Sequence, residues 1–249
     1  MSEKKKNIII VILVALVIIL VATIACLSII IRNKDNIVSS NKQNVEDLVS
    51  TAYYKVIVDN EYNSEYKYDV PKINLKSDNI NAINNEIYKK YVTDIIEPLE
   101  KDAQEGLGIT CIAIDYKYYI NFNILSLVIR WQSHAAGAES FSVYNININT
   151  GETVSNKEII AKKKLTENQY LKELKENYKK ACETYNKASL QPNNQYYESV
   201  LEYTLADENC NINVPMFLDE DGNINVIAYI GSVSGASGYE HILNTRNVK

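Results

Sequence analysis

The chain has 249 residues, of which 46% are hydrophobic and 23% charged, and its formal net charge is −5. This composition is typical of a folded protein and excludes a disordered chain, while the acidic balance argues against a nucleic-acid binder. The length allows one substantial domain or two small ones.

The first feature along the chain is an apolar run from 8 to 31, which contains 24 residues and no charged side chain. A helix of this length reaches about 36 Å, enough to cross a hydrocarbon core of roughly 30 Å. We therefore expect one transmembrane helix at 8–31 that acts as an uncleaved signal anchor. Two alternatives stay open: cleavage as a signal peptide, and lipidation of Cys26, which follows Ala25.

The segments beside this run set the expected orientation. Residues 1–7 hold three lysines and are too short for a domain, whereas a long downstream domain crosses the membrane largely regardless of charge. We expect a single-pass protein of the cell membrane with a cytoplasmic tail at 1–7, a polar stalk at 32–51 and an extracytoplasmic domain at 52–249. Because the tail carries +2 and the stalk is neutral, the domain carries −7, which steers it toward basic partners.

The outer domain alternates strand and helix patterns. Val56–Tyr68 predicts two short strands. From Asp78, apolar residues at steps of three and four predict a helix that Pro98 and then Gly106 end. Three β-rich runs follow, and a hairpin is expected between the first two. These runs are Ile109–Ile120, Ile124–Gln132 and Phe141–Asn149.

The C-terminal part begins with a second helical pattern. Thr166 can cap a helix that runs to Tyr185, and residues 196–206 predict one more short helix. Asp221-Gly222 is a strong hairpin signal between two further strands, at 214–219 and 223–230. Two main helices and at least five strands predict an α+β domain in which an antiparallel sheet packs against two main helices on one face.

Residue types that carry chemistry are sparse. At most one pair of Cys111, Cys182 and Cys210 can form a disulfide, and we interpret them as small buried residues, with a Cys182–Cys210 bridge as the alternative. His134 and His241 have no second ligand at metal-binding spacing, so we expect no metal and no cofactor. Because no nucleophile elbow or phosphate-binding loop is present either, we expect no enzymatic activity.

Two loops are candidate binding sites, because they place isolated aromatic and histidine side chains among small residues. The first loop, 131–141, joins two predicted strands, and the second, 231–241, is rich in glycine and serine. The alternative is that the tryptophan and tyrosine in them pack at the edge of the core. The candidate contact residues are Trp131, His134, Phe141, Tyr239 and His241.

A series of short motifs resembles a known bacterial domain. In chain order they are Ile83-Asn84-Asn85-Glu86-Ile87 in the first helix, the strand Ile124–Ile129, the strand and turn Tyr144–Glu152, and the hairpin Phe217–Gly222. Their order and spacing are similar to those of the extracytoplasmic domain of RsiV-type anti-sigma factors. The same domain is found ahead of the catalytic part of PdaC-type polysaccharide deacetylases.

This resemblance covers roughly residues 52–245 and implies a sheet packed on long helices and a role in the cell envelope. In RsiV-type proteins the domain is a receptor for lysozyme. The chain departs from both families, since residues 1–7 are too few to hold a sigma-binding segment and we expect no deacetylase domain before Lys249. The matching motifs are core-forming, so no ligand-contact residue follows from them.

Together these observations favour a membrane-anchored binding or sensing module of the bacterial cell envelope. Its expected ligand is either a basic protein, such as lysozyme, or a cell-wall glycan. We also expect a membrane signalling protein as a partner, and we expect no binding to nucleic acid. The alternative is a glycan-modifying enzyme of the envelope, which would need a cleft that holds two carboxylates.

Overall fold

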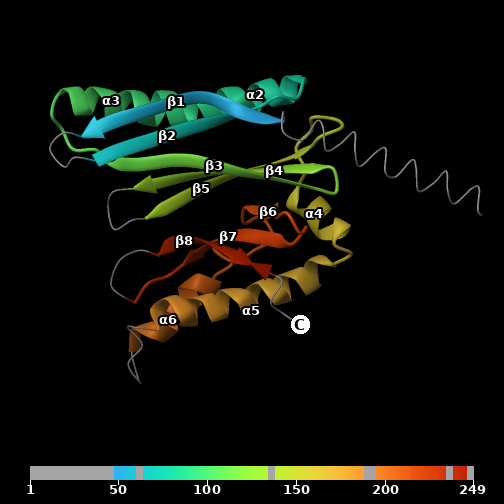
Figure 1. The fold of residues 1–249 in the computed structure, drawn as a ribbon. Helices are drawn as coiled ribbons and strands as arrows, with labels where there is room; N and C mark the ends of the chain where they lie inside the picture. The colour runs from blue at the N-terminus through green and yellow to red at the C-terminus, as the bar shows by residue number, and fades with distance from the viewer. Residues whose placement is uncertain (1–47, 60–63, 134–137, 188–194, 234–237, 246–249) are drawn as a thin grey trace, which may run out of the picture. The chain divides into compact units, whose positions relative to one another are not determined.

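The computed structural model describes residues 48–59, 64–133, 138–187, 195–233 and 238–245 (Figure 1). The predicted transmembrane helix at 8–31 lies outside these residues. None of the helices in the described ranges has the length and apolar character that crossing a bilayer requires.

The described chain is α+β, as the sequence predicted, and antiparallel pairing dominates its sheets. Its elements, in chain order, are β1 (Val49–Asp59), β2 (Ser64–Ile73), α2 (Asp78–Tyr88), the π-helical segment η1 (Lys89–Ile96), α3 (Glu97–Gln104), β3 (Cys111–Asn121), β4 (Ile124–Ser133), β5 (Glu139–Asn147), α4 (Asn156–Lys162), α5 (Glu167–Asn186), α6 (Gln195–Leu205), β6 (Met216–Leu218), β7 (Ile224–Ile230) and β8 (Tyr239–Asn244). β1 begins at Val49, so the predicted start of the domain at residue 52 falls inside a strand.

The first sheet has the strand order β1-β2-β3-β4-β5, with only β2 and β3 parallel among its described pairs. The helical run α2–η1–α3 covers one face of this sheet (Figure 1). Side chains alternate along a strand, so Leu125, Leu127 and Ile129 of β4 enter the core under these helices. The other face of β4 is also buried, because Val128 packs against Phe217 of the second sheet.

Pro98 does not end the first helix, contrary to the prediction. It lies in the first turn of α3, directly after the π-helical segment η1. A proline lacks a backbone N–H and collides with the preceding helical turn. A helix nevertheless tolerates a proline in its first turn, and also directly after a wider π-helical turn. The helical run therefore continues to Gln104, and Gly106 ends it with a φ of +75°.

The prediction of a single sheet with helices on one face was wrong. β6, β7 and β8 form a second, antiparallel sheet whose core lies under α5 and α6. Helices therefore cover both outer faces, with two sheets between them (Figure 1). The apolar alternation along strands shows which residues are buried, but it does not show whether they face a helix or another sheet.

The contact zone between the two sheets, called the seam from here on, contains a buried polar network. Ser126 Oγ donates to Asn145 Oδ1 at 2.7 Å and accepts from the Leu218 backbone N–H at 3.1 Å. Asn145 Nδ2 donates to the carbonyl oxygen of Met216 at 2.7 Å. Because both side chains are buried and these bonds are directional, the network fixes the position of β6 on the first sheet.

Candidate functional site

The predicted contact residues do not converge. Trp131 packs toward the core under α2–η1–α3, whereas Phe141 lies on the opposite face of the same sheet, in the seam. Tyr239 and His241 are on β8 rather than in a loop, because the strand begins at Tyr239. His134 lies outside the described residues. The loop boundaries were wrong because glycine and serine near a strand end resemble a long loop in sequence.

His241 has a packing role in the structure. Its ring stacks on Tyr185 of α5, with a centroid separation of 3.7 Å and an interplanar angle of 14°. Burial lowers the pKa of His241 below its usual value. The ring is therefore neutral at pH 7 and behaves as an aromatic surface between β8 and α5.

The structure instead brings together a charged cluster that the sequence analysis missed. Arg130 of β4 donates from Nε to both carboxylate oxygens of Asp115 on β3, at 3.1 Å each, and from Nη1 to Glu139 Oε1 on β5 at 2.7 Å. These bonds, that to Asp115 above all, raise the pKa of Arg130 above its usual value. A signal was present in the sequence, since Arg130 is a lone arginine in an apolar strand.

This charged cluster borders a cavity of about 510 Å³ at the seam, called the interlayer cavity. Tyr119, Phe141 and Phe217 supply aromatic walls, and the Tyr119 and Phe217 rings stack at 5.7 Å between centroids. An apolar wall with a few convergent polar groups is typical of small-molecule sites, and the volume falls in their usual range of roughly 300–1,000 Å³. The interlayer cavity is therefore a candidate ligand site.

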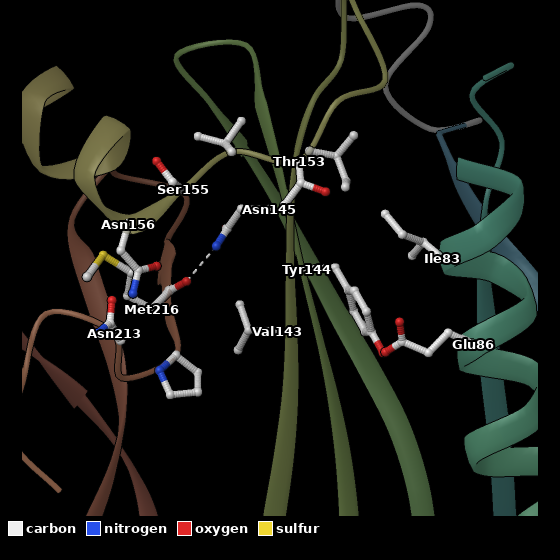
Figure 2. Close-up of a pocket in the computed structure, with 13 residues that line it drawn as sticks. Ile83, Glu86, Val143, Tyr144, Asn145, Thr153, Ser155, Asn156, Asn213 and Met216 are labelled. Atoms are coloured by element: carbon white, nitrogen blue, oxygen red, sulfur yellow. Dashed lines mark hydrogen bonds between the residues drawn. The ribbon is translucent and has the colours of Figure 1, made fainter. Parts of the chain in front are cut away.

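A second cavity of about 390 Å³ lies along β5, between α2 on one side and the start of α4 and β6 on the other (Figure 2). We call it the β5 groove. Tyr144 Oη donates to Glu86 Oε1 at 2.9 Å on the α2 side. On the opposite side the Asn145 amide is held by the Met216 carbonyl, as the dashed line in Figure 2 marks. The groove has both a charged and an apolar wall.

The negative charge of the domain is concentrated in its last part. Residues 188–245 contain eight carboxylates and no lysine or arginine. Helix α6 displays part of this charge beside two exposed tyrosines, Tyr196 (62% exposed) and Tyr203 (47% exposed). The exposed tyrosines and carboxylates of α6 and the turn after it form what we call the α6 surface. It consists of Tyr196, Glu198, Glu202, Tyr203, Asp207 and Glu208.

The three thiols are structural. Cys111, Cys182 and Cys210 are free and buried, so the alternative Cys182–Cys210 bridge is not formed. Burial raises the pKa of Cys111 and of Cys210 to about 11, which keeps both as thiols at neutral pH. Within the described ranges, no group of three or more His, Cys, Asp or Glu side chains is placed to hold a metal ion.

Comparison with known proteins gives no family assignment: the chain matches no protein-family model and no curated protein sequence.

Proposed function

We propose that this protein is an extracytoplasmic binding module, held at the cell membrane by an N-terminal anchor at 8–31, that captures a basic protein. The observation that carries this proposal is the α6 surface, where exposed tyrosines lie among carboxylates in a segment without lysine or arginine. Tyrosine is enriched in protein interfaces, and complementary charge accelerates encounter with a basic partner. Because the domain resembles those of RsiV-type proteins, lysozyme is the first ligand to test.

The test is a titration of the full-length protein with a c-type lysozyme at low and at moderate salt. The proposal expects saturable, sub-micromolar binding that survives moderate salt. Replacing Glu198 and Glu202 by glutamine should weaken binding about tenfold, because two interfacial charges are lost. The matched control replaces two acids of α3, the exposed Glu97 and the half-buried Asp102, by their amides and should change the affinity little.

If salt abolishes binding, or if both double variants lose the same affinity, the attraction is a non-specific effect of charge and the proposal is overturned. Cell-wall glycan fragments are then the next ligands to test, because the proposed role in the cell envelope does not depend on the α6 surface.

The second candidate function is a glycan-modifying enzyme of the envelope. It is favoured by the interlayer cavity, which presents two carboxylates, Asp115 and Glu139, beside aromatic walls. Against it, Arg130 holds both carboxylates in ion pairs, whereas a glycosidase needs one of its two as a proton donor. Release of reducing ends from purified peptidoglycan, lost in Asp115→Asn and in Glu139→Gln, would favour the enzyme.

A further inference from the structure

The outer edge of β5 has a short stretch of open backbone. β5 is the last strand of the first sheet, so one of its edges has no neighbouring strand among the residues that the structure describes. At one end of this edge the Phe141 N–H donates to Glu240 Oε2 at 2.8 Å. At the other end the Asn145 carbonyl accepts from the Val154 N–H at 2.8 Å, and the Asn147 N–H donates to the Glu152 carbonyl at 2.9 Å.

These bonds identify which backbone groups point outward. The N–H and C=O of one strand residue point to the same side, and the side changes with each residue. Because Phe141, Asn145 and Asn147 all bond outward, Val143 between them also directs its N–H and C=O outward. Val143 lines the β5 groove and has no backbone partner on that side among the described residues.

We propose that the β5 groove binds a short extended peptide segment of a partner chain in which a lysine precedes an apolar residue. The open edge between the two blocked ends spans about four residues, or roughly 14 Å, which suits a segment of three or four residues. Such a segment adds a strand to β5 by exchanging two hydrogen bonds with Val143. This proposal is independent of the α6 surface.

The two walls of the groove select the side chains. The ligand residue opposite Val143 places its side chain on the same face as Val143, where Met216 (Figure 2) and Pro215 offer apolar contacts. A ligand residue that exchanges both hydrogen bonds with Val143 runs antiparallel to β5, so the ligand residue before it lies opposite Tyr144. The side chain of that preceding residue points to the opposite face, toward Tyr144 and Glu86.

A cation at the ligand position opposite Tyr144 complements the carboxylate of Glu86 on α2. Glu86 accepts the Tyr144 hydroxyl through Oε1, and Oε2 has no hydrogen-bond partner among the described residues. The neighbouring cation, Lys90, is bound elsewhere, since its Nζ donates to Ser142 Oγ at 2.7 Å. A ligand lysine therefore meets a carboxylate that has capacity for it.

The experiment uses the full-length chain labelled with ¹⁵N-valine and the capped peptide acetyl-Lys-Val-Ala-amide. We expect the Val143 amide resonance to shift and saturate with this peptide, and the acetyl-Glu-Val-Ala-amide peptide to bind much more weakly. Glu86→Gln retains an acceptor for Tyr144 and should weaken binding of the lysine peptide about threefold, the size of one partly exposed ion pair. Glu97→Gln, an equal loss of charge outside the groove, should leave the affinity unchanged.

A modified peptide tests the backbone pairing without changing the protein. N-methylation of the peptide valine removes the donor to the Val143 carbonyl and should weaken binding about fivefold. A second test is Val143→Pro, which removes only an outward N–H and is tolerated at a sheet edge. Equal binding of the methylated and parent peptides, equal binding of the lysine and glutamate peptides, or an unmoved Val143 resonance would each overturn the proposal.

Discussion

Residues 49–147, the first sheet with α2–η1–α3, and residues 154–245, the second sheet with α4, α5 and α6, bury tyrosines in different ways. In the first region Tyr68 Oη donates to the Cys111 carbonyl at 2.7 Å and Tyr91 Oη to Ser142 Oγ at 2.8 Å. In the second region the hydroxyls of Tyr170 and Tyr178 are buried with no hydrogen-bond partner among the described residues. These buried tyrosines of the first region are therefore held by hydrogen bonds as well as by packing, whereas those of the second are held by packing.

The two regions also differ in how they hold their charges. The first region pairs several of its carboxylates with cations, as in the contacts of Arg130 with Asp115 and Glu139. In the second region the stretch 188–245 has no lysine or arginine of its own. The second region also forms ion pairs, Lys157 with Glu167 and Lys175 with Asp207, but Glu198 and Glu202 of α6 are exposed, where a basic partner can meet them.

The largest expected effect tests whether the regions unfold together. Leu127→Ala in the first core and Leu174→Ala in the second should each destabilise the protein by about 3 kcal/mol, because both side chains are fully buried. The chain has one tryptophan, and Trp131 packs in the first region, so its fluorescence follows that region. If the seam couples the regions, Leu174→Ala lowers the denaturation midpoint seen by Trp131 as much as Leu127→Ala does.

An unchanged Trp131 transition in Leu174→Ala, with earlier loss of helical circular dichroism, would show instead that the second region unfolds by itself.

The next effect concerns the seam. Asn145→Ala leaves the Met216 carbonyl and the Ser126 hydroxyl without their partner in a buried site, which should cost about 2 kcal/mol. Denaturant unfolding measures this loss. Asn149→Ala, at an exposed turn position on the same chain segment, is the matched control and should stay within about 0.5 kcal/mol of wild type. Equal effects of the two substitutions would mean that the polar network does not hold the sheets together.

A third prediction uses pH to separate the regions. In the second region Asp219 accepts hydrogen bonds from the Asn223 backbone and from the side chains of Asn223, Asn225 and Asn244. Burial alone would raise the pKa of Asp219, but these hydrogen bonds outweigh it and lower the pKa below its usual value. The stabilisation is therefore present above about pH 4 and is lost as the pH falls through the lowered pKa of the folded state.

Asp219→Asn should cost about 1.5 kcal/mol at pH 7, since it removes a charged acceptor, and should flatten the acid limb of the stability curve. Thermal unfolding between about pH 7 and pH 3 measures both. If Asp219→Asn loses stability at low pH as steeply as the wild type does, the acid sensitivity belongs to other carboxylates.

Local sequence patterns predicted the parts of the fold that local physics decides. The cap at Thr166 and the hairpin turn at Asp221-Gly222 are where the sequence placed them: the Thr166 side chain accepts from the Gln169 N–H, and Gly222 has a φ of +74°. Pairings between distant segments escaped prediction. The Phe141 N–H meets Glu240, 99 residues away, and no periodicity in either strand encodes that contact.

The candidate sites escaped prediction for the same reason. The sequence analysis chose aromatic and histidine residues near glycines, yet both cavities lie at or beside the seam, which exists only once two sheets stack. Arg130 stands out as a lone arginine in an apolar strand, but Asp115 and Glu139 look like ordinary solvated charges until three adjacent strands bring them beside it. To find such a cluster from the sequence one must know the register of the strands, and a single sequence leaves that register open.

The smallest expected effect tests the comparison of the two cores directly. Tyr68→Phe removes the donor to the buried Cys111 carbonyl and should cost about 1 kcal/mol, because that acceptor is left without its hydroxyl partner. Tyr178→Phe removes a buried hydroxyl that has no partner, so it should be neutral or slightly stabilising.

Both substitutions delete the same atom from a fully buried ring, so loss of packing cancels between them and the difference in unfolding free energy isolates the hydrogen bond. A cost of about 1 kcal/mol in Tyr178→Phe as well would mean that the Tyr178 hydroxyl binds a buried water molecule, because removal of a hydroxyl without any partner breaks no hydrogen bond. The buried tyrosines of the second region would then be held by polar contacts as those of the first are, with water as the acceptor.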